Sequence, residues 1–126
     1  MAEGAVDVHV NASPGEVWGL VNDFGGLADW MPGIDSCRVE GEDRVVSAGG
    51  NEVRERLVSS DDATMSLTYA IVGGMPIDGH QATVSVAPEG DGSKVTWTVE
   101  VTPDERLPMF TGIYQGALQA LAARFG

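Results

Sequence analysis

Basic residues are scarce in this sequence, and their scarcity limits what the protein can bind. Seven lysine and arginine residues stand against nineteen aspartate and glutamate residues, which gives a formal net charge of −12. A strongly negative surface repels the phosphates of nucleic acids and of anionic membranes. The composition therefore argues against nucleic acid as a partner.

Long apolar runs and cysteines are also lacking. No segment approaches the roughly 18 apolar residues that a membrane-spanning helix requires, and the first residues do not have the pattern of a secretory signal. The single cysteine, Cys37, cannot form an internal disulfide and suits a reducing compartment. We therefore expect a soluble, cytoplasmic protein without membrane insertion, in which Cys37 packs as a small side chain on a strand.

The sequence contains no set of residues that predicts a metal site, a nucleotide site or a nucleophile. Its two histidines, His9 and His80, lie far apart in the chain and have no further ligands at compatible positions. No Gly-x-Ser-x-Gly segment is present, and Gly73-Gly74 is followed by neither a phosphate-loop lysine nor a helix start. We therefore expect no metal and no cofactor.

What the sequence does contain is alternation. Apolar and polar residues alternate with the period of two that is typical of half-buried strands. The predicted strands cover residues 6–10, 34–40, 44–47, 53–57, 65–71, 82–86 and 95–101. Short turns join most of the later strands, so consecutive strands should pair in antiparallel fashion.

Two regions have helical signals instead. Ser13 followed by Pro14 is a helix start, and the helix should run to about Asn22 or Asp23, with a second small turn over Leu27–Trp30. The longer helix is predicted over Leu107–Phe125. Its apolar stripe consists of Phe110, Ile113, Tyr114, Ala117, Leu118 and Leu121.

A sheet with one apolar face and a helix with one apolar stripe bury these surfaces against each other. The order of elements therefore predicts a single α+β domain over residues 1–126 with a helix-grip fold. In this fold a curved antiparallel sheet of about six to seven strands wraps around a long C-terminal helix, and short helices lie between strands 1 and 2.

One predicted strand contains a charge on its apolar face. Period-two geometry places Glu55 on the same face as Val53 and Leu57, where the core should be. A carboxylate in that position finds a partner, becomes protonated, or faces a wet cavity. An edge strand with both faces solvated, or an ion pair with a basic neighbour, would also explain it.

Several short segments also occur in the order and spacing of a known superfamily. On these segments the sequence is identified as a member of the START and birch-pollen-allergen superfamily, in its polyketide cyclase/dehydrase and lipid-transport branch, and it is similar to plant abscisic acid receptors. The segments are Val17-Trp18, Phe24, residues 34–39, residues 55–57, Asp61-Asp62, residues 71–74 and Met109-Phe110.

The resemblance implies a cavity between the sheet and the last helix that holds a small hydrophobic ligand, such as a lipid, a polyketide or an isoprenoid-like compound. It places the pocket-facing glutamate of the family at Glu55 and two loops that close over the ligand at residues 47–51 and 73–77. Met31 stands where the receptors have a carboxylate-binding lysine. The resemblance and the apolar pattern together give ten predicted ligand-binding residues: Trp30, Met31, Glu55, Tyr69, Met75, His80, Trp97, Phe110, Tyr114 and Leu118.

Three functions remain open from the sequence. The first is ligand binding alone, in which Glu55 contacts a polar group of the ligand. The second is a polyketide cyclase or dehydratase reaction with Glu55 as acid or base, aided by His80 or Tyr114. The third is self-association through Gly112, Gly116 and Ala120 on the outer side of the last helix, so the chain is expected to be a monomer or a weak homodimer. Large side chains such as Trp97 could also fill the cavity.

Overall fold

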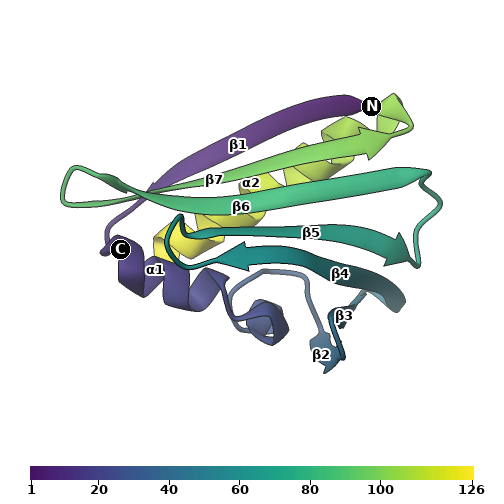
Figure 1. Cartoon of the computed structure of the whole chain (residues 1–126), viewed down its shortest axis with the longest axis horizontal. Coiled ribbons are helices and arrows are strands. Elements are labelled where there is room, and N and C mark those ends of the chain that lie inside the picture. Colours follow the sequence, from purple (N-terminus) through teal and green to yellow (C-terminus); the bar gives the residue numbers. More distant parts are fainter.

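The computed structural model describes all 126 residues and forms one curved, seven-stranded antiparallel sheet around a long helix (Figure 1). The elements are β1 (Ala2–Val10), α1 (Pro14–Val21), the 3₁₀ helix η1 (Phe24–Asp29), β2 (Ser36–Glu40), β3 (Asp43–Ala48), β4 (Asn51–Asp61), β5 (Ser66–Gly73), β6 (Gly79–Glu89), β7 (Gly92–Thr102), the 3₁₀ helix η2 (Asp104–Arg106) and α2 (Leu107–Arg124). The strand order is β1-β7-β6-β5-β4-β3-β2. The predicted helix-grip fold is therefore confirmed.

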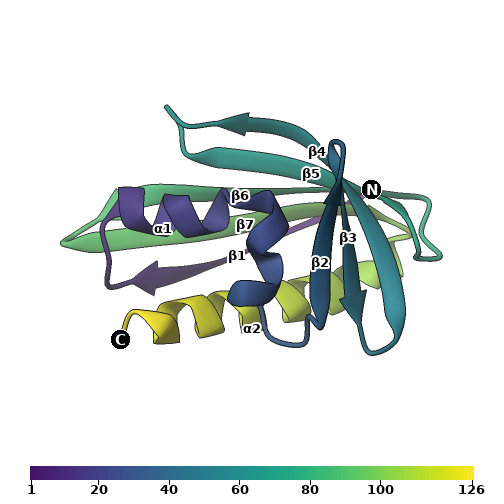
Figure 2. The ribbon, with the colours of Figure 1, turned by 90° about the horizontal axis from the view of Figure 1, so that it is seen from below.

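Strict alternation decides which face of the sheet is buried. In β7, Val95, Trp97 and Val99 are all at most 2% exposed, whereas the threonines between them point outward. The same face is covered by both helices: α2 packs against β1 and β7, and α1 packs against β6 and β7 (Figure 2). The sheet and the two helices thus enclose one apolar core.

The stripe of α2 is narrower than the sequence predicts. Phe110, Tyr114, Leu118 and Leu121 are buried as expected, but Ile113 is 45% exposed. Ile113 lies at the edge of the stripe, one position before Tyr114 and 100° away around the helix, so its side chain reaches the border of the core rather than its centre.

Two bulges bend the sheet where β4 pairs with β5. The pairing skips Val72 in β5 and Val58 in β4, and both of these extra residues are exposed. A bulge adds twist and turns the strand. Figure 2 shows the result: β4 is strongly curved, and β2 and β3 stand at a steep angle to β5, β6 and β7. The end of the sheet therefore curls over its own concave face.

The connection between α1 and β2 differs in detail from the prediction. Ser13 begins α1 as expected, and its hydroxyl oxygen accepts a hydrogen bond from the Glu16 amide at 3.4 Å. The α1 helix ends at Val21 with Asn22 as its C-cap, close to the predicted end at Asn22 or Asp23. The small turn expected over Leu27–Trp30 is part of η1, which begins earlier, at Phe24, and is kinked at Gly26. The next strand begins at Ser36 rather than Ile34, and Cys37 is half-buried on it.

Candidate functional site

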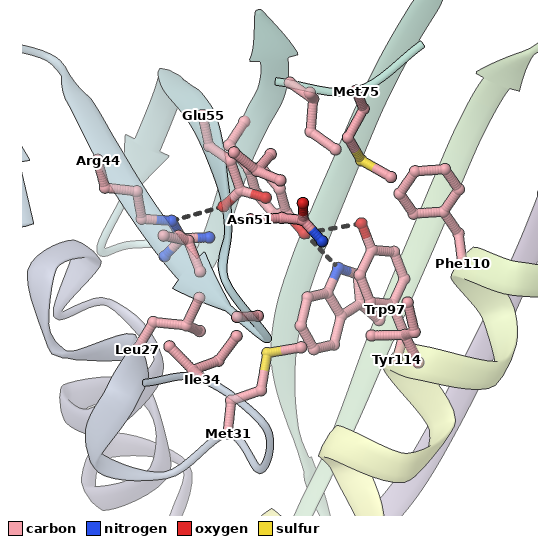
Figure 3. A pocket seen from close by; sticks show the side chains of 16 residues that line it. Leu27, Met31, Ile34, Arg44, Asn51, Glu55, Met75, Trp97, Phe110 and Tyr114 are labelled. Atoms are coloured by element: carbon pink, nitrogen blue, oxygen red, sulfur yellow. Dashed lines mark hydrogen bonds and ion pairs between the residues drawn. The ribbon is translucent and has the colours of Figure 1, made fainter. Parts of the chain in front are cut away.

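A cavity of about 150 Å³ lies between the concave face of the sheet, α2 and the segment that follows η1 (Figure 3). An apolar cavity of about this size holds one benzene molecule. Thirteen of its sixteen lining residues are hydrophobic. The lining residues are Leu27, Met31, Ile34, Arg44, Val46, Ala48, Asn51, Val53, Glu55, Tyr69, Ile71, Met75, Trp97, Phe110, Ile113 and Tyr114.

Loops and an exposed helix edge contribute to the lining. Met31 and Ile34 come from the segment between η1 and β2, Asn51 from the first position of β4, and Met75 from the connection between β5 and β6. Ile113, half-exposed on α2, is also a lining residue. The predicted loops at residues 47–51 and 73–77 thus both contribute side chains to the cavity.

The charge predicted on the apolar face has a partner. Glu55 is buried, and its Oε1 accepts a hydrogen bond from Arg44 Nε at 2.7 Å. The two residues face each other across the β3–β4 ladder. Arg44 Nη1 donates to the Phe24 carbonyl at 3.1 Å, and the guanidinium lies over the Phe24 ring, 4.1 Å from its centre. The carboxylate is therefore neutralised by a guanidinium that is itself held in place.

Glu55 retains one free oxygen. Every side-chain nitrogen or oxygen that is fully excluded from solvent has a hydrogen-bond partner. Glu55 Oε2 has no hydrogen-bond partner. That atom must therefore have some exposed surface, and Glu55 lines the cavity. Figure 3 shows Arg44 and Glu55 together on one side of the cavity, opposite Phe110 and Tyr114.

A second polar group consists of four aromatic side chains. Trp97 Nε1 donates to the Tyr69 hydroxyl at 3.2 Å, the hydroxyls of Tyr69 and Tyr114 are 3.0 Å apart, and His80 Nε2 lies 2.9 Å from the Tyr114 hydroxyl. The rings of Trp97 and Tyr114 stack with centres 4.0 Å apart. These contacts fix the position of both hydroxyls.

Burial keeps this group uncharged. Loss of solvent lowers the pKa of His80 to about 4. Loss of solvent also raises the pKa of Tyr69 and Tyr114 well above the usual value for a phenol. The Ile71 amide donates to His80 Nδ1 at 3.2 Å, so the imidazole proton is on Nε2. At neutral pH the four side chains therefore form a neutral hydrogen-bonded chain.

Seven of the ten predicted residues line the cavity: Met31, Glu55, Tyr69, Met75, Trp97, Phe110 and Tyr114. The other three do not. His80 lies behind Tyr114, Leu118 is fully buried in the core, and Trp30 lines a separate, much smaller space next to Trp97. Both ring nitrogens of His80 are engaged within the protein, so the structure leaves it no free nitrogen for proton transfer with Glu55.

The prediction missed Arg44, which is the partner that the Glu55 argument required. The signal was present in the turn at Gly49-Gly50. A two-residue turn centred there pairs residues whose numbers sum to 99, and this places Arg44 opposite Glu55. Asn51 was also absent from the ten predicted residues, although it lies within the predicted closing loop at residues 47–51.

The whole chain, residues 1–126, matches the sequence profile of the family described as polyketide cyclase / dehydrase and lipid transport. The chain belongs to this family. Its structure is similar to that of XoxI from Bacillus cereus, with 30% identity, a TM-score of 0.94, and coverage of 99% of this chain and 96% of XoxI. No protein of curated function matches the sequence.

Two more distant structures share the fold. A START superfamily protein from Mycobacterium smegmatis has a TM-score of 0.81 at 17% identity, with 98% and 96% of the two chains covered. Ara h 8.0201 has a TM-score of 0.78 at 19% identity, with 98% and 97% covered. These two structures show the fold alone, whereas the sequence profile confirms the polyketide cyclase/dehydrase and lipid-transport family predicted from the sequence.

Two kinds of feature are absent from the structure. It has no three histidine, cysteine, aspartate or glutamate side chains grouped so as to hold a metal ion. None of its helices combines the length and the hydropathy needed to cross a membrane.

Proposed function

We propose that this chain binds a small, mainly apolar ligand in the cavity between the sheet and α2. The observation that carries the proposal is the lining itself, which is hydrophobic except for a few polar groups held in fixed positions. Such a lining is the usual composition of a small-molecule site. A lipid, a polyketide or an isoprenoid-like compound fits this chemistry.

The cavity volume limits how much of the ligand is enclosed. About 150 Å³ takes one six-membered ring, so a longer ligand would place its ring or chain end inside and extend past Met31, Asn51 and Met75. Asn51 and Met75 belong to the two segments proposed to close over the ligand, and Met31 lies between η1 and β2. In this proposal Phe110, Tyr114 and Trp97 form the apolar wall and Glu55 contacts a polar group of the ligand.

Native mass spectrometry tests the proposal when it is followed by solvent extraction and identification of any released compound. We expect a discrete extra mass on the purified wild-type protein. The variant Ile71→Trp fills the cavity and should lack this mass. Its control is Val72→Trp, because Val72 is the next residue but is 46% exposed on the outer face. Equal loading of both variants, or no compound bound to wild type from any extract, would contradict the proposal.

The exposed oxygen of Glu55 supports one alternative, a cyclase or dehydratase in which Glu55 is the acid or base. The two functions differ in the effect of Glu55→Gln. For a catalytic acid or base the change removes turnover of a polyketide-like substrate, by about 10²-fold or more, while binding persists. For a contact to the ligand it weakens binding by a modest factor, and no reaction is detected with either protein.

The assembly state is part of the proposal. Gly112 and Gly116 are exposed on α2 and have open space around them, so a second copy could approach there, and we expect a monomer or a weak homodimer. Light scattering over a dilution series tests this expectation. A cytoplasmic location likewise remains a prediction from the sequence.

A further inference from the structure

The aromatic chain behind the cavity has one more hydrogen-bond donor than it can use. Its four side chains carry four polar protons: Trp97 Nε1–H, His80 Nε2–H and the two hydroxyl protons of Tyr69 and Tyr114. Only three hydrogen bonds join them. Trp97 and His80 each donate one of these bonds, and one tyrosine donates the third.

The position of the imidazole proton supports this count of hydrogen-bond donors. His80 Nδ1 accepts from the Ile71 amide, so Nδ1 carries no proton and Nε2 must be the donor toward Tyr114. The Trp97 indole can only donate. Neither neighbour can therefore accept a proton from a tyrosine, and one of the two hydroxyl protons has no acceptor in this group.

The spare tyrosine hydroxyl proton can point only toward the cavity. Tyr69 and Tyr114 both line the cavity, and no other side chain accepts from either hydroxyl. In Figure 3 the Tyr114 side chain extends from α2 with its hydroxyl pointing toward the side of the cavity where Glu55 lies. A phenol donor fixed by its neighbours therefore faces a space whose lining is mainly apolar.

The rest of the cavity disfavours a charged ligand. Arg44 is paired with Glu55, so the pair adds no net charge. The residue at position 31 is a methionine and offers no charge to an anion. A neutral ligand whose polar atom accepts a hydrogen bond satisfies the phenol without burying an unpaired charge.

From this arrangement we propose that the ligand carries a neutral carbonyl group whose oxygen accepts the spare hydrogen bond of the Tyr69–Tyr114 pair. The proposal rests on the proposed binding function and adds the polarity of the ligand. A ketone or enone should bind better than a hydrocarbon of the same shape. A hydroxyl elsewhere on the same ligand could donate to Glu55 Oε2.

The test compares acetophenone with α-methylstyrene, which has the same shape but a carbon in place of the carbonyl oxygen. We expect wild type to bind acetophenone more tightly by about two- to tenfold, the contribution of one hydrogen bond. We also expect the carbonyl ¹³C resonance of labelled acetophenone to move downfield on binding, as it does when a carbonyl accepts a hydrogen bond.

The tyrosine variants give the sharper result. After Tyr69→Phe, the Tyr114 hydroxyl still accepts from His80 and is free to donate into the cavity. After Tyr114→Phe, the Tyr69 hydroxyl still accepts from Trp97 and is free in the same way. Each single variant should therefore keep the preference for acetophenone and the downfield shift. The double variant also frees the Trp97 Nε1–H, which lines the cavity, so both signals should be lost only in the triple variant Tyr69→Phe/Tyr114→Phe/Trp97→Phe.

Three outcomes overturn the inference. Equal affinity of wild type for the two probes shows that the spare proton does not reach a ligand. A preference that survives in the folded triple variant assigns the contact to another donor, such as Arg44. If neither probe binds wild type, the proposed cavity function fails as well, whereas binding of both probes with equal affinity contradicts the carbonyl contact alone.

Discussion

At the scale of single residues, the Arg44–Glu55 pair is the most constrained feature of the site. Both side chains are nearly excluded from solvent, with 5% and 12% of their surfaces exposed. Removing one partner leaves a buried charge unpaired. We expect Arg44→Met to lower the free energy of unfolding by about 3 to 5 kcal/mol, measured by urea denaturation.

The double variant Arg44→Met/Glu55→Leu is the matched control. It removes both charges and keeps the apolar volume, so it should recover most of the lost stability. Arg38→Met should have a much smaller effect, because Arg38 is half-exposed in its pair with Glu40. If Arg44→Met is no more damaging than Arg38→Met, the pair is not held in the buried geometry described above.

His80 should make stability depend on pH in a defined range. Its pKa is lowered to about 4 in the folded chain, and a free imidazole has a pKa of about 6.5. Between these values the unfolded chain binds the proton and the folded chain does not. Stability is therefore fully present above about pH 6.5 and falls as the pH drops toward about 4.

His80→Gln isolates this contribution. Other acidic groups titrate in both proteins, so the informative quantity is the difference in unfolding free energy between wild type and variant at pH 7 and at pH 5. We expect wild type to lose more stability than the variant over this interval. Parallel loss in the two proteins would mean that His80 is not buried in its neutral form.

These residues also show how far sequence reasoning reaches. The period of two was enough to place Glu55 on the buried face, but the identity of its partner depends on the pairing register. The placement of His80 behind Tyr114 depends on how α2 crosses the sheet, and no local pattern specifies that crossing. Side chains that meet through tertiary packing were therefore the ones that the sequence left unresolved.

At the scale of elements, the connection between β5 and β6 depends on one glycine. Gly74 has a φ of +90°, and an added Cβ would collide with the backbone oxygen of Glu52. We expect Gly74→Ala to lower the free energy of unfolding by about 1 to 3 kcal/mol. The change should also disturb Met75, the next residue and a cavity wall.

Gly112→Ala is the control, and it should have the opposite effect on stability. Gly112 lies on the exposed side of α2 with open space around it, so alanine should raise stability by about 0.5 to 1 kcal/mol. Thermal denaturation of both variants measures the contrast. A neutral Gly74→Ala variant would show that the loop does not require the left-handed backbone.

Elements with long, regular patterns were the most predictable. The range Leu107–Phe125 was predicted for the last helix, and α2 ends one residue earlier. The short η1 was not placed correctly, because glycine raises the cost of a regular helix but does not prevent a 3₁₀ turn. The β4–β5 bulges could not be read from alternation, although they create the room for the cavity.

At the scale of the whole molecule, the fold followed from the order of elements and the family from the resemblance of short segments, whereas the chemistry of the ligand followed from neither. The chain uses four of its seven basic residues, Arg38, Arg44, Arg54 and Arg56, in ion pairs of β2, β3 and β4. The outer acidic surface is therefore left with little positive charge. A neutral, mainly apolar ligand is consistent with this balance.

The central claim is that the cavity takes up a small apolar molecule, and methionine methyl resonances test it most directly. The five methionines fall into two groups: Met31 and Met75 line the cavity, whereas Met1, Met65 and Met109 do not. In a titration of protein labelled with ¹³C at the methionine ε-methyl groups, acetophenone should produce saturable shifts at Met31 and Met75 and leave Met1 and Met65 in place. Uniform shifts at all five methyl groups, or none up to the solubility limit, would contradict the account.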